Sequence, residues 1–271
     1  MTPAPKVAYL VPHTHWDREW YLTFPEFRVM LVRAVKGVLD ALEQDPEFRH
    51  FCLDGQAVAL EDHLEAAPED EERLRRHVRS GALAVGPWYV LPDEFLIAPE
   101  THVRNLLLGH EVASSFGPVQ KVGYAPDAFG HVAQMPQILR RAGIGTFVYQ
   151  RGNGDEIDRL GWEYAWRAPD GSEVLALCLP GGYCNAGGLG FEEIWHTHTA
   201  REVDPARAVE QVRALFSRYA ERSRTDLWLL LNGCDHFPAQ RDFGRVLAAL
   251  SAAFPRTVFR PASLTEYLSS L

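Results

Sequence analysis

Short apolar runs alternate with amphipathic segments along nearly the whole chain, and this alternation constrains the fold more than any other feature. Strand-like runs lie near residues 7–12, 51–53, 83–88, 122–125, 146–150, 174–179 and 227–231. Between them, apolar residues recur at spacings of three and four, as in amphipathic helices, in segments 26–44, 57–66, 70–79, 101–115, 134–142, 204–221 and 240–252. Strands that alternate with helices are typical of a parallel sheet wrapped by helices. The sequence therefore predicts an α/β fold, and seven strands favour a β/α barrel.

One segment departs from the alternation. Residues 162–177 contain two strand-like arms around an Asp-Gly pair, which is typical of a hairpin. We therefore expect an irregular seven-stranded β/α barrel. The 271 residues, 46% of them hydrophobic, can bury one large core and are close in number to a single barrel domain. We expect one domain over residues 1–271.

Composition and charge argue against several classes of partner. The net charge is −9, and no basic stretch is long enough to neutralise a run of phosphates, so we expect no nucleic-acid partner. The N-terminus has no hydrophobic signal core, and no apolar run approaches the ~20 residues that span a bilayer. The sequence predicts no membrane partner and a cytoplasmic location.

The cysteines show no CxxC spacing, and we expect all four to be reduced and buried: Cys52, Cys178, Cys184 and Cys234.

Polar residues follow the first strand-like run and could bind a metal ion. His13, His15 and Asp17 alternate in sequence. Alternate side chains of an extended segment point the same way, so His15 and Asp17 can converge on one ion. The other interpretation is that a histidine caps the strand and Asp17 begins a turn or pairs with Arg18.

Two more carboxylates follow later strand-like runs. Asp127 lies in a turn-rich segment after residues 122–125 and is a candidate ligand or nucleophile, with a structural cap as the alternative. Asp235 follows the apolar run 227–231, where a general acid could be partly desolvated, although Asn232-Gly233 could simply begin a turn there. In parallel α/β folds, such strand ends collect at one rim, so these residues suggest one site.

Aromatic and polar residues near the predicted rim suit a sugar. Tryptophan and tyrosine rings could stack on pyranose faces, and charged groups could bind hydroxyls. Each signal alone is weak, because an aromatic residue at a strand end more often completes a core. The candidate substrate-binding residues are Trp20, Trp88, Asp93, Arg151 and Tyr183, with Trp16, Tyr89 and Glu94 beside them.

Two sequence segments that contain candidate site residues together resemble the α-mannosidases of glycoside hydrolase family 38. They are His13-Thr-His-Trp-Asp-Arg-Glu-Trp20 and Pro126-Asp-Ala-Phe-Gly-His131, the latter followed by Gln134-Met-Pro136. Further similarity appears in the expected order in Leu53-Asp-Gly-Gln56, Val85-Gly-Pro-Trp-Tyr89, Arg104-Asn-Leu106, Gln150-Arg151 and Asn232-Gly-Cys-Asp235. The resemblance covers nearly the whole chain and is strongest to the bacterial branch.

The resemblance implies a fold, a metal and a reaction. The family's catalytic domain is an irregular seven-stranded β/α barrel that holds one zinc ion in the substrate site. By resemblance, His15 and Asp17 are zinc ligands, and Asp127 is both a ligand and the nucleophile. Asp235 is then the leading candidate for the acid/base. The implied activity is that of a retaining α-mannosidase, which uses two carboxyl groups on an α-mannoside oligosaccharide or glycan.

The chain also departs from the family pattern. The resemblance implies downstream helical and β-rich domains and a fourth zinc ligand, a histidine, from that region. This sequence stops at Leu271. We expect either a fragment, or a short form completed by another chain as a homo-oligomer, or an inactive protein. His236, His131 or His13 could replace the missing ligand.

Two other functions stay open. One is a metal-dependent hydrolase of the amidohydrolase type, which would need further histidines and often a bridging lysine at later strand ends. Lys121 precedes its strand, and the strand near 146–150 ends in Gln150-Arg151. The other is a carbohydrate-binding barrel that has lost catalysis, which the missing fourth ligand would favour.

Overall fold

The computed structural model of the chain describes residues 4–199 and 201–271. Its first sheet is entirely parallel and is built around β1, with hydrogen-bonded order β3-β2-β1-β8 and β9 also paired to β1. β9 pairs with the first half of β1, whereas β2 pairs with its last two residues. The strands are β1 (Val7–Thr14), β2 (Phe51–Leu53), β3 (Leu83–Ala84), β8 (Leu227–Asn232) and β9 (Val258–Pro261).

The second sheet has the order β4-β5-β7-β6, and only the β6–β7 pair is antiparallel. This pair is the predicted hairpin. Its turn includes Gly171, whose positive φ of 87° suits glycine. The strands are β4 (Gly123–Ala125), β5 (Thr146–Tyr149), β6 (Glu163–Arg167) and β7 (Glu173–Cys178).

The predicted closed barrel is not confirmed. Among the described residues, the strands form two sheets, and no named strand of one sheet pairs with a strand of the other. The strand expected at 83–88 ends after Ala84, because Gly86 has a φ of +80° and Pro87 has no amide proton for a ladder. The observed fold is therefore a mixed α/β fold with mainly parallel sheets.

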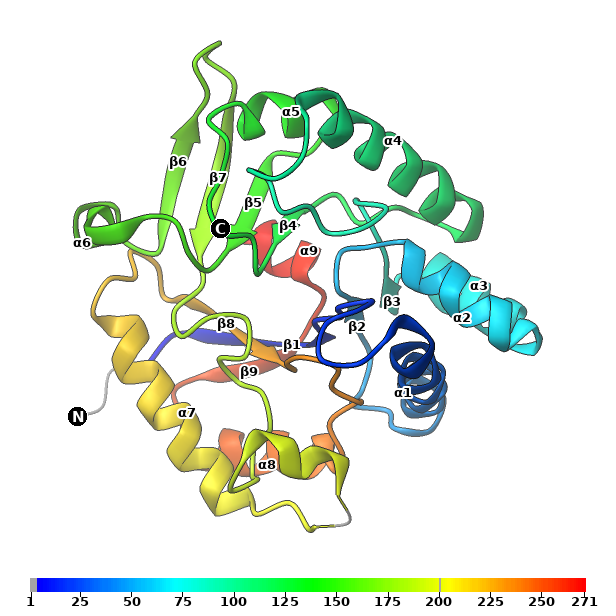
Figure 1. Ribbon diagram of the computed structural model, residues 1–271. Helices are drawn as coiled ribbons and strands as arrows, with labels where there is room; N and C mark the ends of the chain where they lie inside the picture. Colours follow the sequence, from blue (N-terminus) through cyan, green and yellow to red (C-terminus); the bar gives the residue numbers. More distant parts are fainter. Residues whose placement is uncertain (1–3, 200) are drawn as a thin grey trace.

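Most of the helices cover the sheets on the outside (Figure 1). α1, α2 and α3 lie beside the β1 sheet, α7 and α8 lie along its other side, and α4 and α5 lie over the second sheet. The seven predicted helices are confirmed, whereas α6, α9 and β9 are too short to give a clear periodic signal. The helices are α1 (Phe24–Gln44), α2 (Val58–Ala66), α3 (Glu71–Ser80), α4 (Pro99–Phe116), α5 (Met135–Arg141), α6 (Ile157–Leu160), α7 (Pro205–Ala220), α8 (Phe243–Ala253) and α9 (Leu264–Leu268).

β1 is buried on both faces and separates two hydrophobic cores. Ala8 and Leu10 belong to the larger core, and Tyr9 and Val11 to the smaller one. Fully burying a side chain of the size of leucine contributes roughly 1.5–3 kcal/mol. The residues that follow β1 therefore begin from a firmly held strand end.

Two of the four cysteines are bonded to each other, which corrects the expectation that all are reduced. Cys184 and Cys234 form a disulfide with a Cα–Cα distance of 4.6 Å. They lie 50 residues apart, and only the fold shows that the loop after β7 returns beside the end of β8. Cys52 and Cys178 are free and buried, as predicted.

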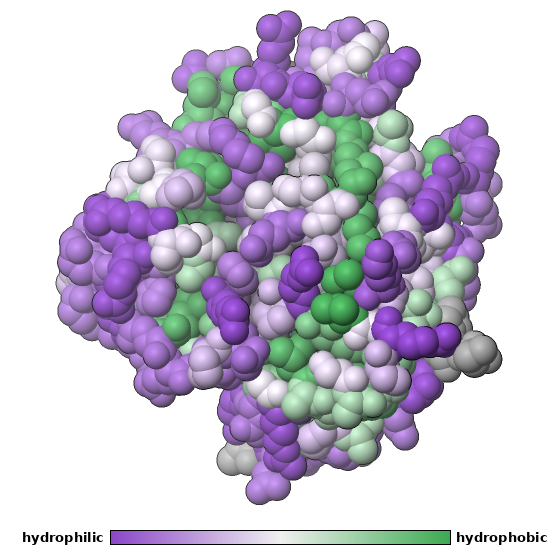
Figure 2. All heavy atoms as spheres, turned by 180° about the vertical axis from the view of Figure 1, so that it is seen from behind, coloured by the Kyte–Doolittle hydropathy of each residue, from purple (hydrophilic) through white to green (hydrophobic). Residues whose placement is uncertain are grey.

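Among the described residues, no helix is both long enough and apolar enough to cross a bilayer. Figure 2 shows the face opposite to the view of Figure 1, where hydrophobic residues form patches among hydrophilic ones.

Gly109 of α4 allows this helix to lie directly on the segment that follows β3. A Cβ at this position would overlap backbone atoms of Trp88 and Tyr89, whereas a Cβ on Gly37 of α1 would meet nothing within 4 Å. We predict that Gly109→Ala lowers the free energy of unfolding by about 2–3 kcal/mol. Gly37→Ala should raise it by roughly 0.5–1 kcal/mol. Urea denaturation measures both, and equal effects of the two substitutions would contradict this packing.

Candidate active site

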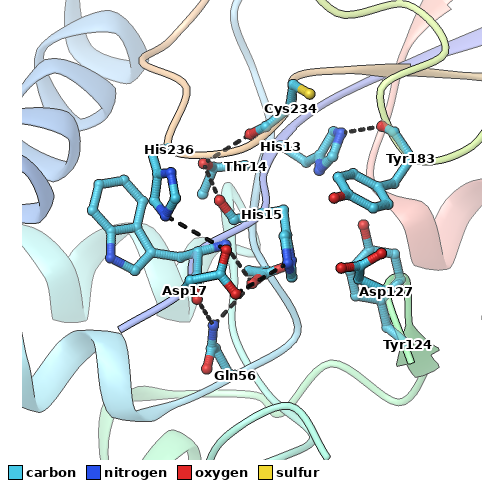
Figure 3. A network of polar contacts seen from close by, with 12 residues as sticks. His13, Thr14, His15, Asp17, Gln56, Tyr124, Asp127, Tyr183, Cys234 and His236 are labelled. Carbon is cyan, nitrogen blue, oxygen red and sulfur yellow. Dashed lines mark hydrogen bonds and ion pairs between the residues drawn. The ribbon is translucent and has the colours of Figure 1, made fainter. Parts of the chain in front are cut away.

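A cavity of about 210 Å³ opens at the carboxyl ends of β1 and β4. Polar groups line it from both strands and from the loop after β3, and apolar residues complete its wall. The polar lining residues are His15, Asp17, Asp93 and Asp127, and the others are Leu91, Pro92, Ala125, Pro126, Ala128 and Phe129. The structure therefore brings the three predicted metal ligands to one cavity. Figure 3 shows His15 and Asp17, with Tyr183 and Asp127 on the other side of the His15 ring.

His15 is held from behind by a buried carboxylate. Its Nδ1 lies 3.0 Å from Oδ1 of Asp54, and Asp54 is fully buried. Burial lowers the pKa of His15, but the charge of Asp54 and its hydrogen bond, together with the charges of Asp17 and Asp235, outweigh burial and raise this pKa to about 9. Asp54 is not among the predicted site residues, although its place directly after β2 is the same signal that identified Asp17 and Asp127.

Asp17 lies next to the free side of the His15 ring. Its Oδ1 is 3.7 Å from His15 Nε2, and its Oδ2 is 3.7 Å from His236 Nε2. Two ligands that each lie about 2.1 Å from a tetrahedral zinc ion are roughly 3.4 Å apart. The nitrogen of His15 and the oxygen of Asp17 thus have the chemistry and nearly the spacing of two ligands on one ion.

Asp127 faces the cavity but is engaged by a cation. Its Oδ1 accepts a hydrogen bond of 2.9 Å from Gln150 Nε2. The same oxygen forms an ion pair with Arg151. Metal binding by Asp127 would therefore require its carboxylate to exchange Arg151 for the ion. His15, Asp17 and Asp127 share the cavity without forming a compact set of ligand atoms.

Among the described residues, one set of three potential ligands has all its ligand atoms within 4.8 Å of one another. It consists of Cys184, Cys234 and Asp235. Because the two sulfurs form a disulfide, they are not thiolate ligands.

Asp235 is brought to His15 by strand pairing beyond the end of β8. The two residues form a parallel β-bridge, in which His15 N donates to Cys234 O and His236 N donates to His15 O. Oδ1 of Asp235 is buried and has no hydrogen-bond partner among the described residues. Burial raises the pKa of the Tyr183 hydroxyl, and the neighbouring carboxylate of Asp235 raises it further. Asp235 and Tyr183 thus lie together next to His15, whose ring centre is 4.9 Å from that of Tyr183.

The structure corrects one predicted sugar contact and leaves another outside the cavity. Trp88 is fully buried, and its Nε1 donates to Tyr124 O at 2.9 Å, so it has no free face for a pyranose. Trp20 is 65% exposed and packs on Tyr21, but it does not line the cavity. Arg151 lies over the ring of Phe129 at the cavity wall.

The three candidate replacement histidines differ in what their ring nitrogens contact. His13 Nε2 contacts Tyr183 O at 2.8 Å. Both nitrogens of His131 are engaged, Nδ1 with Glu94 and Nε2 with Arg151 O, each at 2.8 Å. His236 Nε2 has no hydrogen-bond partner among the described residues. His13 Nδ1 is also without a partner among the described residues, but it is His236 Nε2 that lies 3.7 Å from Asp17 Oδ2.

The fold and the cavity define a mixed α/β protein with a site built from histidine and carboxylates at strand ends. Residues 6–270 match the model of the glycosyl hydrolases family 38 N-terminal domain. The chain belongs to this family.

Individual relatives agree with this assignment. The chain is 36% identical over 98% of its length to a protein of Halalkalibacterium halodurans named "Putative mannosylglycerate hydrolase", of which it covers 30%. It is 31% identical over 62% of its length to human alpha-mannosidase 2C1, of which it covers 16%. It superposes with a TM-score of 0.88 and 34% identity on the crystal structure of an alpha-mannosidase from Enterococcus faecalis V583, covering 97% of this chain and 29% of that one. The chain thus spans less than a third of the length of these relatives.

Two buried histidines make the stability of the fold depend on pH. Burial lowers the pKa of His13 to about 4 and that of His236 to about 4. Between pH 6.5 and about 4 the unfolded chain therefore binds more protons, so the free energy of unfolding falls as the pH falls through this window. Each histidine accounts for up to about 3 kcal/mol.

We predict that His13→Gln makes the free energy of unfolding less dependent on pH between pH 6.5 and 4. Urea denaturation at several pH values, with wild type alongside, measures this difference. If the free energy of unfolding changed with pH by the same amount in both proteins, this result would contradict a buried, neutral His13.

Proposed function

We propose that the chain is the catalytic domain of a zinc-dependent retaining α-mannosidase. The observation that carries this proposal is that His15, Asp17 and Asp127 line one cavity in a member of glycosyl hydrolase family 38. His15 Nε2 and Asp17 Oδ1 would hold the zinc ion, and Asp127 would complete the set from the opposite wall. When bound, zinc would orient sugar hydroxyls and stabilise negative charge on them.

Asp127 and Asp235 have the roles of the two carboxyl groups that a retaining glycosidase requires. Asp127 attacks the anomeric carbon and forms a covalent glycosyl-enzyme, while the bond to the leaving oxygen breaks. Asp235 donates a proton to that oxygen and then accepts one from the water that releases the sugar. Its unpartnered Oδ1 and its place beside Tyr183 support this assignment, because an acid/base needs an oxygen free to exchange a proton.

Arg151, Asp93 and Tyr183 are proposed to contact the substrate. Arg151 and Asp93 lie at the cavity with Asp127, and Tyr183 is a neighbour of both His15 and Asp235. Trp20 could reach a sugar only outside the cavity, where its exposed ring is available. These contacts would select an α-mannoside, as an oligosaccharide or as part of a glycan.

Mannosylglycerate is the first small substrate to test. The relative from Halalkalibacterium halodurans carries that substrate in its name, whereas other relatives are named alpha-mannosidases.

The cytoplasmic location stays a prediction, and the Cys184–Cys234 disulfide counts against it because disulfides are rare in that compartment. Self-association and a downstream domain also stay predictions.

We predict that Asp127→Asn lowers hydrolysis of an aryl α-mannoside by roughly a thousand-fold or more, because an amide cannot act as the nucleophile. Asp155→Asn, on the exposed surface, is the control and should keep wild-type activity. Release of 4-nitrophenol measures both. Full activity of a folded Asp127→Asn variant would exclude Asp127 as the nucleophile.

We also predict one zinc ion per chain, lost on replacement of His15 by alanine. Elemental mass spectrometry of protein dialysed against dilute zinc measures the stoichiometry. His110→Ala is the control, because His110 lies on α4 and does not line the site. Equal zinc content in wild type and His15→Ala would place the metal elsewhere.

A further inference from the structure

Asp54 lies behind His15, outside the cavity, and no substrate could reach it. We infer that Asp54 is a positioning residue that fixes the ring and the tautomer of His15, so that Nε2 is the nitrogen offered to the metal. This inference rests on the proposed metal site and adds a residue to it. Its support comes from the contacts of Asp54, its backbone conformation and the place of the His15 ring.

Every polar contact that the structure gives Asp54 joins it to the end of β1 or to the turn that holds it there. Oδ1 lies 3.0 Å from His15 Nδ1, and Oδ2 accepts hydrogen bonds from Trp16 N at 2.7 Å and from Gln56 Nε2 at 2.8 Å. Gln56 Nε2 also donates to Trp16 O at 2.8 Å. An isolated buried carboxylate costs several kcal/mol, so Asp54 depends on these contacts, and they in turn fix His15 and Trp16.

The backbone at Asp54 adopts a conformation that directs its side chain to β1. Its φ is +50°, in the left-handed region, and Gly55 follows with a φ of +65°. A non-glycine residue in this region costs roughly 1 kcal/mol, a cost that persists only where surrounding contacts compensate for it. A Cβ on Gly55 would lie 2.9 Å from the ring of Tyr124, so the turn also fits tightly against β4. Figure 3 shows Gln56 below Asp17.

The consequence for His15 concerns which nitrogen carries the proton. With Asp54 accepting from Nδ1–H, the lone pair of the neutral ring is on Nε2, which lies 3.7 Å from Asp17 Oδ1. Histidines that bind metals almost always donate their other N–H to a carboxylate or a carbonyl, and loss of that partner typically weakens metal binding 10–100-fold.

A second buried histidine–aspartate pair in the chain shows what a purely structural pair is like. His63 Nε2 lies 3.0 Å from Asp70 Oδ2, and His63 is fully buried. Its other nitrogen has no partner among the described residues, and the pair does not line the cavity. The His63–Asp70 pair has the same residue types at the same distance as the His15–Asp54 pair, so it serves as an internal control.

The test is the zinc affinity of Asp54→Asn, measured by competition with a coloured chelator. Asparagine has nearly the same shape as aspartate, and its carbonyl can still accept from Trp16 N and Gln56. Its NH₂ group then faces His15 Nδ1 and donates to it, which moves the ring proton to Nε2. We expect the zinc Kd to rise 10–100-fold. Asp70→Asn should leave the zinc Kd unchanged, although it lowers stability because it breaks the buried pair with His63.

A folded Asp54→Asn variant with the wild-type zinc Kd would overturn the inference. If Asp54→Asn does not fold, ¹⁵N NMR of wild-type histidines decides the question. On zinc addition, Nε2 of His15 should shift as a metal-bound nitrogen while Nδ1 keeps its proton, and the signal is assigned by its loss in His15→Gln. Metal binding at Nδ1 would overturn the inference in the same way.

The outcomes also separate this inference from the proposed function. If wild type binds no zinc, or if His15→Ala leaves the Kd unchanged, the metal site itself is wrong and the inference falls with it. If zinc binds through His15 but Asp54→Asn and Asp70→Asn have equal effects, only the role of Asp54 is wrong.

Discussion

The pairing of β1 with β8 beyond their regular ends is the interaction on which the candidate site depends. β1 is buried on both faces, and the backbone bonds between His15 and residues 234 and 236 continue its parallel register with β8. This pairing sets a proposed metal ligand beside a proposed acid/base. Weakening it would move both groups together, so the geometry of the reaction rests on main-chain hydrogen bonds held by a hydrophobic core.

Negative charge is concentrated around this strand end. Asp17, Asp54, Asp127 and Asp235 all lie near His15, and Arg151 pairs with Asp127. Like charges in one place repel, and a bound cation relieves that repulsion more effectively than water does in a partly buried site. Burial raises the pKa of Asp17, His15 lowers it, and the carboxylates of Asp54, Asp235 and Asp127 raise it further. The charge pattern therefore supports the metal proposal independently of family membership.

Much of the fold could be predicted from periodicity, because long amphipathic helices such as α1 and buried strands such as β1 carry strong local signals. The hairpin of β6 and β7 was predicted by its Asp-Gly turn. Closure of a barrel was predicted but is not confirmed, because β3 ends after two residues at Gly86-Pro87 and no named strand of the described residues joins the two sheets. The Cys184–Cys234 disulfide and the burial of Trp88 depend on contacts between distant segments. The strand-end rule located His15, Asp17 and Asp127. It applies to Asp54 as well, but the contact of this buried carboxylate with His15 is seen only in the folded chain.

The central claim is that Asp127 forms a covalent bond to the sugar in this cavity. The most direct measurement is mass spectrometry of the zinc-loaded protein after reaction with a 5-fluoro-mannosyl fluoride, which forms the glycosyl-enzyme quickly and releases it slowly. The account predicts one added sugar per chain, attached to the peptide that contains Asp127. Turnover of an aryl α-mannoside without any trapped adduct, or an adduct on another carboxylate, would contradict it.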